Sequence, residues 1–381
     1  MYLYIHVPYC PSHCIYCDFM VVLKKHSSQY GGDQALSSNM MEEWGERIRP
    51  FSQEYRNNHP LKGIYVGGGT PSLLPAAIYK EWLEKIQLSW PLAPDAEITM
   101  EANPNAWASQ PRDYLQAGFN RLSIGIQSLN DLELKALSRI HTSEEAMNCV
   151  RTCQDAGFTN ISVDMMVGIP KQTRESWAET LQKLVSLDVQ HVSMYGLQVE
   201  EATPLHQLVN MGAYPLPTED EHVAMKRFGV RFLEDAGYRA YEFSNLSKSG
   251  YASRHNQNYW QQGDYLALGP GAHGYVHPKR YANSRDMEQW LNNPTESSKV
   301  QSVSDDERLE NVMIFGLRQT AGVDREAVIQ QFGVDVLDRF APQIGKWIER
   351  GALLWEQGTR RVRFHPDWEA TSNTVLADFI S

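Results

Sequence analysis

Short apolar segments alternate with amphipathic segments along the first 200 residues of the chain. The apolar segments are rich in β-branched residues, which favour strands, and they cover residues 2–8, 63–67, 97–102, 121–127, 160–167 and 191–197. Between them, apolar residues recur at helical spacing, as do Ile78, Trp82 and Ile86. Parallel strands need a crossover helix between them, so the six β–α repeats predict an α/β fold whose parallel sheet curls into a partial (β/α)6 barrel.

One of the predicted helices carries two cysteines, Cys149 and Cys153. Thr142 and Glu145 form a capping box at its start, and Gly157 ends it. The cysteines are four residues apart on the apolar face, so we expect small buried core residues. A second metal site is the alternative, although no partner ligand suggests it.

The pattern changes after the barrel region, which we place at residues 1–203. In the accessory region, residues 204–302, one helix is expected at 218–236 and an α+β organisation overall. Its second half is rich in Gly, Asn and Tyr, and irregular segments of this length are usually functional.

Residues 303–381 are expected to form a small separate module. Helices are predicted at 306–319, 324–331 and 335–350, and a hairpin that turns near Gly358 follows them. Helices followed by a hairpin are typical of a winged-helix-like module.

Charge and hydropathy narrow the functional classes. The net charge is −11, and no apolar segment approaches the roughly 18 residues of a membrane span. The first residues lack the basic region and cleavage site of a secretory signal, so we expect a cytoplasmic protein. Residues 303–381 hold 9 basic and 13 acidic residues. We therefore expect no nucleic-acid binding, despite Arg360, Arg361 and Arg363 in the hairpin.

Three of the five cysteines, Cys10, Cys14 and Cys17, lie within eight residues directly after the first predicted strand. Such crowding is unlike a disulfide scaffold. Three closely spaced thiolates suit three irons of an iron–sulfur cubane and leave the fourth iron open. Zinc is the alternative, and it would want a fourth ligand. His13 lies between two of the cysteines, where its reach is awkward.

Polar residues recur where the predicted strands end, which is where barrel folds place their ligand groups. Residues 67–71 (GGGTP) close the second strand, and glycines there let the backbone approach a ligand. Glu101 and Gln127 end the next two strands, and Asp164 lies late in the fifth. Each alone could cap a loop, but their recurrence at one level favours a shared polar site.

The Cys-x3-Cys-x2-Cys loop after the first strand resembles that of the radical S-adenosylmethionine (SAM) superfamily. The resemblance implies a [4Fe–4S] cluster on Cys10, Cys14 and Cys17, with SAM on the open iron. It also implies further cofactor contacts, which by position fall on Tyr4, Tyr16, Gly68, Gly69, Thr70, Glu101, Gln127, Arg139 and Asp164. A guanidinium such as Arg139 suits the SAM carboxylate, because it can bind in a fork.

Over nearly the whole chain, the sequence resembles the branch that contains oxygen-independent coproporphyrinogen III oxidase and the haem chaperone HemW. The oxidase pattern has a fourth cysteine where this chain has Phe19, and an amino-terminal extension, whereas this chain reaches its first cysteine at residue 10. Residues 255–260 (HNQNYW) match the HNxxYW motif of the haem chaperones. The resemblance implies that His255 binds haem, and imidazole is a common axial ligand.

Two functional classes therefore remain. The first is a haem chaperone that binds haem and transfers it to an acceptor haemoprotein. The second is a radical SAM enzyme that acts on a tetrapyrrole, as a decarboxylating oxidase or a methyltransferase. The motif and Phe19 favour the first. The resemblance leaves open a membrane-associated acceptor and a homodimer. His273 and His277 are secondary haem-ligand candidates.

Overall fold

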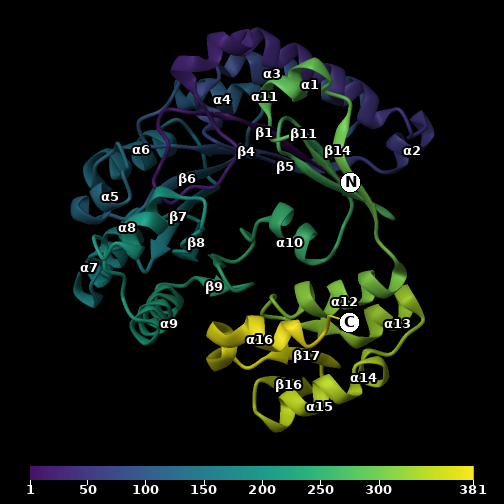
Figure 1. Ribbon diagram of the computed structural model, residues 1–381. Coiled ribbons are helices and arrows are strands. Elements are labelled where there is room, and N and C mark those ends of the chain that lie inside the picture. Colours follow the sequence, from purple (N-terminus) through teal and green to yellow (C-terminus); the bar gives the residue numbers. More distant parts are fainter. Residues whose placement is uncertain (381) are drawn as a thin grey trace.

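The computed structural model describes residues 1–380, which are built around one mixed sheet (Figure 1). The six predicted strands are present, adjacent and parallel. They are β1 (Tyr2–Val7), β4 (Leu61–Gly68), β5 (Leu92–Ala102), β6 (Arg121–Gln127), β7 (Ile161–Val167) and β8 (His191–Gly196). The predicted α/β partial barrel is therefore confirmed.

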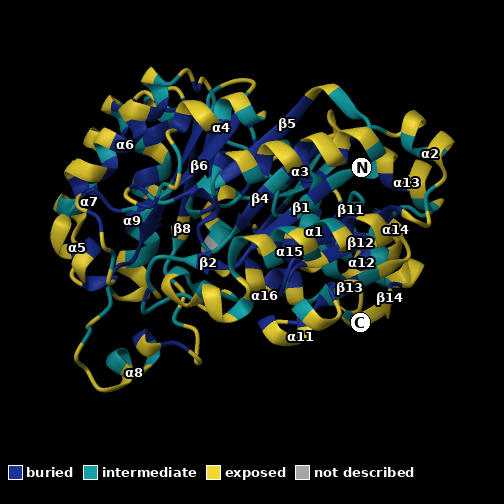
Figure 2. Ribbon diagram, turned by 90° about the horizontal axis from the view of Figure 1, so that it is seen from above, coloured by how far each residue is buried: buried dark blue, intermediate teal, exposed yellow. Residues whose placement is uncertain are grey.

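Helices cover the outer face of this sheet. They are α1 (Gly32–Ile48), α2 (Gln53–Asn58), α3 (Ala76–Ser89), α4 (Pro111–Ala117), α5 (Asp131–Ala136), α6 (Ser143–Asp155), α7 (Arg174–Ser186) and α9 (Glu219–Asp235). In β1, Leu3, Ile5 and Val7 pack into the core between sheet and helices, whereas Tyr4 faces the inside of the barrel. Figure 2 shows the strands as the most buried layer and the outer faces of the helices as exposed. The inner face is thus left to polar and aromatic side chains.

The cysteines of α6 belong to this core. Cys149 and Cys153 are both buried among apolar side chains, as the helical spacing predicted. The capping box of Thr142 and Glu145 is also present. The second-metal alternative gains nothing from this placement.

The accessory region contributes strands to both edges of the barrel sheet. Next to β1 lie β11 (Tyr265–Leu268), β12 (His273–Val276), β13 (Lys279–Asn283) and β14 (Ser297–Ser302), and beyond β8 lie β10 (Asn245–Ser247) and β9 (Arg239–Ala240). The strand β11 is parallel to β1, and the others pair antiparallel. Short helices connect them, namely α8 (Pro204–Asn210), α10 (Arg254–Trp260) and α11 (Met287–Asn292). The boundaries at residues 203 and 302 stay predictions.

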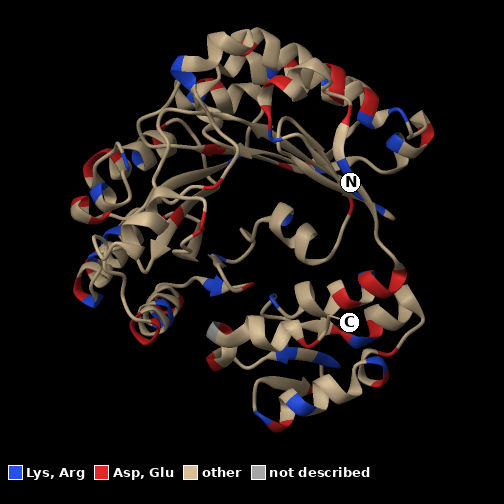
Figure 3. Cartoon of the chain, viewed as in Figure 1, with Lys and Arg blue, Asp and Glu red and all other residues tan. Residues whose placement is uncertain are grey.

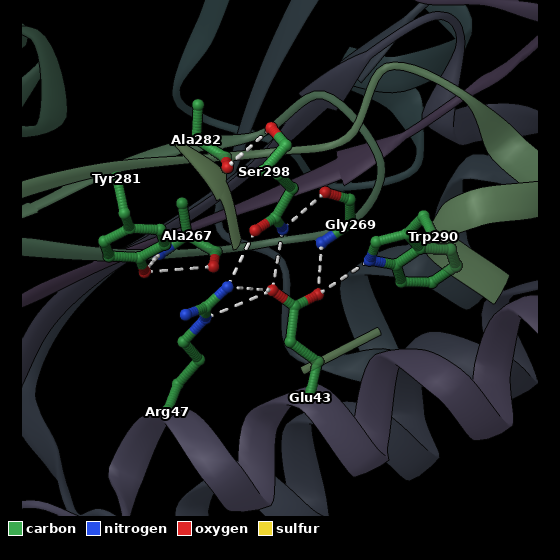
Figure 4. A network of polar contacts seen from close by, with 9 residues as sticks. Glu43, Arg47, Ala267, Gly269, Tyr281, Ala282, Trp290 and Ser298 are labelled. Carbon is green, nitrogen blue, oxygen red and sulfur yellow. Dashed lines mark hydrogen bonds and ion pairs between the residues drawn. The ribbon is translucent and has the colours of Figure 1, made fainter. Parts of the chain in front are cut away.

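A buried carboxylate joins α1 to the added strands (Figure 4). Glu43 is fully buried and accepts hydrogen bonds from Gly269 N at 2.8 Å and Asn283 Nδ2 at 2.7 Å. Trp290 Nε1 donates to it at 3.2 Å, and Arg47 forms an ion pair with it at 3.1 Å. Because a buried charge is tolerated only when it is paired and hydrogen-bonded, this network holds the accessory strands on the barrel.

The C-terminal module has its own apolar core. It consists of α12 (Asp305–Gly316), α13 (Arg325–Phe332), α14 (Val336–Arg339), α15 (Ala341–Glu349) and α16 (Ser372–Ala377) with the strands β15 (Val323–Asp324), β16 (Leu353–Glu356) and β17 (Arg361–Phe364). The single helix predicted at 335–350 is wrong in detail, because it is broken at Phe340, just before the first-turn proline of α15.

Acidic and basic residues are interspersed over the outer helices and the module (Figure 3). The hairpin arginines each have an acidic partner: Arg360 pairs with Glu326, Arg361 with Asp324 at 2.7 Å and Arg363 with Glu356 at 2.6 Å. These cations are therefore partly neutralised within the module. No helix in residues 1–380 is both long enough and apolar enough to span a membrane.

Candidate cluster and cofactor site

The cysteine loop begins where β1 ends. Cys10 closes the short strand β2 (Tyr9–Cys10), which pairs with β3 (Val22–Leu23), and a turn joins Cys17 N to Cys14 O at 3.1 Å. His6 Nε2 lies 3.0 Å from Met20 O and fastens the far end of the loop to β1. The alternative ligand His13 instead contacts the Cys17 carbonyl at 3.1 Å.

The three thiols differ in exposure. Cys14 is buried, and Cys10 and Cys17 are partly exposed. Burial raises the pKa of the Cys10 and Cys17 thiols, so a metal has to displace their protons when it binds. Within residues 1–380, no three His, Cys, Asp or Glu side chains converge on one metal-ion position. A [4Fe–4S] cubane binds one thiolate on each of three irons. Its cysteine ligands therefore surround the cluster and do not converge on one metal position. The donor set therefore fits an iron–sulfur cluster.

A chain of polar contacts starts at one cysteine and returns to another. Cys10 Sγ lies 3.4 Å from Thr70 Oγ1, which accepts from Asn103 Nδ2 at 2.9 Å. Asn103 Oδ1 accepts from Arg139 Nη2, and Arg139 Nη1 lies 3.5 Å from Cys14 Sγ. The ends of β4 and β5 are thereby connected to the loop after β1.

Arg139 is a partly buried cation that forms no ion pair with a carboxylate within residues 1–380. Its acceptors are the Asn103 amide, the Gly125 carbonyl at 2.7 Å and the Cys14 sulfur, and Nε has no partner within residues 1–380. A buried charge is costly when it is not compensated. The site is therefore suited to an anionic group, such as ionised thiolates or the carboxylate of a ligand.

Glu101 is held at the end of β5 by two donors. Tyr65 Oη donates to Oε1 at 2.7 Å, and Gly68 N donates to Oε2 at 3.0 Å. Burial raises the pKa of Glu101 to about 7. Gly67 has to be glycine here, because a Cβ would come within 3.0 Å of the Glu101 carboxyl group.

The glycine loop approaches its own chain closely. A Cβ on Gly69 would lie 2.5 Å from Tyr9 O. The Gly69 and Thr70 amides are already donated to Val7 O at 2.9 Å and Tyr9 O at 2.6 Å. The N–H groups of these two residues are therefore occupied by hydrogen bonds within the protein. A ligand could accept nothing from them and could bind only to their carbonyl groups.

The remaining strand-end candidates gather nearby. Gln127 has a positive φ of 70°, which is uncommon for a residue with a side chain and often marks a functional position. A Cβ on Gly125 would lie 3.2 Å from Gln127 Nε2 and 3.7 Å from Arg139 Nη2, so these two side chains converge over Gly125. Asp164, one strand further, accepts from Ser123 Oγ at 3.1 Å.

The two tyrosine candidates lie in different places. Tyr16 packs against a small apolar cluster of Leu137, Met166 and Ile169, near the ends of β7 and β8. Tyr4 lies inside the barrel, and its hydroxyl is 3.1 Å from His6 Nδ1. Tyr4 therefore acts on the cysteine loop through His6, which carries the contact on to Met20.

His255 is enclosed inside the barrel and is only 2% exposed. Its ring stacks on Tyr65 at 5.0 Å, and Nε2 lies 2.7 Å from Tyr259 Oη. Nδ1 has no partner among residues 1–380. Burial lowers the pKa of His255 to about 3, and the nearby Arg121 adds to this effect, so the ring is neutral. The secondary candidates His273 and His277 are both exposed.

The motif helix α10 lies between the barrel sheet and the C-terminal module (Figure 1). Its amino terminus is held by Glu97 of β5, which accepts from the backbone amides of Arg254 and His255, each at 3.3 Å. Its carboxyl-terminal residues Tyr259 and Trp260 line a cavity of about 380 Å³. The motif therefore faces a ligand-sized space with its aromatic residues, whereas its histidine faces the barrel.

Three contributing residues were not predicted from the sequence: His6, Tyr65 and Asn103. Asn103 follows β5 directly, so the polar strand-end signal that selected Glu101 also applies to it. His6 and Tyr65 lie within strands, and only the packing between β1, β4 and β5 shows what their side chains contact.

Comparisons with protein families agree with this geometry. The model of the radical SAM superfamily matches residues 4–184, and the model of the HemN C-terminal domain matches residues 303–360. The chain is 31% identical to the heme chaperone HemW of Bacillus subtilis, and the match covers 92% of each chain. It is 37% identical to HemW of Escherichia coli over 72% of this chain and 70% of that one. The chain is also 35% identical to the mitochondrial radical S-adenosyl methionine domain-containing protein 1 of Mus musculus. This match covers 92% of this chain and 78% of that one.

A solved structure has the same fold. Coproporphyrinogen III oxidase (HemN) from Escherichia coli, described as a radical SAM enzyme, superposes with a TM-score of 0.81, covers 99% of this chain and 89% of its own, and is 19% identical. Fold and cysteine loop together define a member of the radical SAM superfamily. Within it, the chain belongs to the HemW family of haem chaperones.

Proposed function

We propose that this protein is a haem chaperone, which binds haem and transfers it to an acceptor haemoprotein. The observation that carries the proposal is the placement of the HNxxYW motif. Its aromatic residues Tyr259 and Trp260 line a cavity of about 380 Å³, within the 300–1,000 Å³ typical of ligand pockets. Aromatic rings offer flat apolar surface to a macrocycle. Membership of the HemW family supports the same ligand.

The proposal includes a [4Fe–4S] cluster and SAM at the strand ends. Cys10, Cys14 and Cys17 would hold the cluster, which would supply a binding site for SAM and one-electron chemistry. The partly buried guanidinium of Arg139 would bind the SAM carboxylate. Gln127 and Asp164 suit ribose hydroxyls, and the other expected contacts fall on Tyr4, Tyr16, Gly68, Gly69, Thr70 and Glu101.

Within this site, the chain's own side chains would bind and orient SAM. The polar chain from Thr70 through Asn103 to Arg139 sets the position of the guanidinium relative to the cysteine loop. Tyr16, packed on Met166 and Ile169, gives the adenine an apolar surface. The five free cysteines are consistent with a reducing compartment such as the cytoplasm.

The test is an anaerobic titration of the cluster-reconstituted protein with haem, followed by the Soret band. Saturable binding, and then transfer of the bound haem to an apo-haemoprotein, is the expected result. Absence of specific binding would exclude the chaperone function. Cys14→Ser should lose the cluster absorbance, whereas Cys149→Ser, a buried cysteine outside the loop, should keep it. A parallel assay of SAM cleavage with coproporphyrinogen III tests the alternative of a tetrapyrrole-modifying enzyme.

A further inference from the structure

We propose that the cavity beside α10 is a binding site for one edge of a tetrapyrrole, with Arg280 at its mouth as the partner of a propionate group. The proposal rests on the proposed function and deepens it, because it places the porphyrin between the motif helix, the accessory strands and the C-terminal module. His255 does not line this cavity.

The wall of the cavity is largely aromatic. Tyr259 and Trp260 come from α10, Tyr265 from β11 and Phe315 from α12. Tyr259 and Tyr265 meet edge to face at 4.6 Å, and Trp260 lies 6.2 Å from Phe315. Four rings from three elements make a surface that suits a flat apolar ligand. We place one edge of the tetrapyrrole against these four rings.

The cavity also holds polar groups that lack partners. Trp260 Nε1 and Asn311 Nδ2 are buried, and neither has a hydrogen-bond acceptor among residues 1–380. Both residues belong to the lining. Because buried donors are normally satisfied, two such donors in one wall point to a ligand that supplies acceptors.

Arg280 gives the site its charge. It lies on β13, lines the cavity and is about two-fifths exposed. Its partner Glu307 is 3.4 Å away and is also partly exposed. An exposed ion pair of this kind contributes little, so a propionate can take the place of Glu307 on the guanidinium. An apolar wall with a cation at the rim matches a ring that carries carboxylates on one edge.

Tyr259 separates this cavity from His255. Its ring lines the cavity, while its hydroxyl lies 2.7 Å from His255 Nε2. Porphyrin binding in the cavity therefore does not need the histidine. An iron–histidine bond would need Tyr259 to move. The two contributions can be measured separately with a porphyrin that contains no metal.

The experiment uses the full chain and metal-free protoporphyrin IX, titrated by porphyrin fluorescence. Arg280→Gln should weaken binding about tenfold, as expected for the loss of one charge-assisted hydrogen bond. Lys279→Gln is the matched control, because it removes the same charge from the neighbouring position of β13, on the opposite face. It should bind as the wild type does. With the dimethyl ester of protoporphyrin IX, the difference between wild type and Arg280→Gln should disappear.

A second variant fills the cavity. Asn311→Phe should weaken binding of both porphyrins, with unchanged far-ultraviolet circular dichroism. If Arg280→Gln and Asn311→Phe both bind protoporphyrin IX as tightly as a wild type that binds it saturably, the cavity is not the site, and the chaperone function stands. If the wild type binds neither haem nor protoporphyrin IX, both proposals are wrong.

Discussion

Arg139 Nη1 lies 3.5 Å from Cys14 Sγ, although the two residues are 125 positions apart in the chain. This contact brings a partly buried cation, three residues after α5, to Cys14, the only buried cysteine of the three. No carboxylate neutralises the guanidinium within residues 1–380, and its Nε has no acceptor there. A partly buried charge without an ion-pair partner is costly for the protein alone, and an anionic ligand would compensate it.

Arg139→Gln should therefore weaken SAM binding and have only a small effect on the free energy of unfolding. The loss of a charge-assisted contact to the carboxylate should raise the dissociation constant by about tenfold or more, measured by equilibrium dialysis with the cluster-loaded protein. Arg151→Gln, on the exposed side of α6, is the control and should have no effect. If Arg139 only connects parts of the fold, Arg139→Gln should instead lower the stability and leave the SAM affinity unchanged.

Glu101 should make the stability of the cofactor-free protein depend on pH. Burial raises its pKa to about 7, above the 4.5 of a free glutamate. Between these values the folded state binds more protons than the unfolded state, so the contribution of Glu101 to stability is present below pH 4.5 and is lost as the pH rises to 7. Glu101→Gln mimics the protonated acid and can keep both contacts, to Tyr65 and to the Gly68 amide.

The measurement is urea unfolding of wild type and Glu101→Gln between pH 4.5 and pH 8. The wild type should lose stability relative to the variant as the pH rises, by about 3 kcal/mol in total, and the difference should level off near pH 8. A constant difference over this range would show that the carboxyl group titrates normally. Glu97→Gln is a less suitable variant, because Glu97 holds the start of α10.

The barrel was predictable because its strands are buried and apolar. The added strands were not, since their sequences are short and mixed. β14 reads SSKVQS and is almost entirely exposed, and β9 has two residues. Their place in the sheet is determined by pairing with β13 and β10, which lie elsewhere in the chain. Local patterns do not contain that information.

In the candidate site, too, local signals were predictable from the sequence and contacts between distant segments were not. Glu101, Gln127 and Asp164 were found because a polar residue at the end of an apolar strand is a local signal. The rings that enclose His255, Tyr2 and Tyr65, could not be named from the sequence, because they come from β1 and β4. Their proximity follows from the closure of the barrel around α10, which the motif itself does not encode.

Glu43 should be essential for holding the accessory strands to the barrel. Glu43→Ala would leave the Gly269 and Trp290 donors without their acceptor and the Arg47 charge without its carboxylate, at a cost of about 3–5 kcal/mol. Glu46→Ala is the matched control, one turn along α1. Its ion pair with Arg49 is exposed, so the cost should stay below about 1 kcal/mol. Urea unfolding followed by tryptophan fluorescence measures both, and equal costs would contradict the role of the network.

His255 should contribute to the binding of haem iron and not to the binding of the porphyrin ring. The ring of His255 is neutral, but its Nε2 can bind the iron of a porphyrin in the cavity only after the contact of Nε2 with Tyr259 opens. His255→Ala should therefore shift the Soret band of bound haem and weaken haem binding, while the affinity for metal-free protoporphyrin IX and the cluster absorbance stay unchanged. Tyr259→Phe removes the hydroxyl that holds Nε2 and should make iron ligation easier, with tighter haem binding as the result. If His255→Ala weakens haem and protoporphyrin IX equally, the histidine acts through the packing of α10 and not as a ligand.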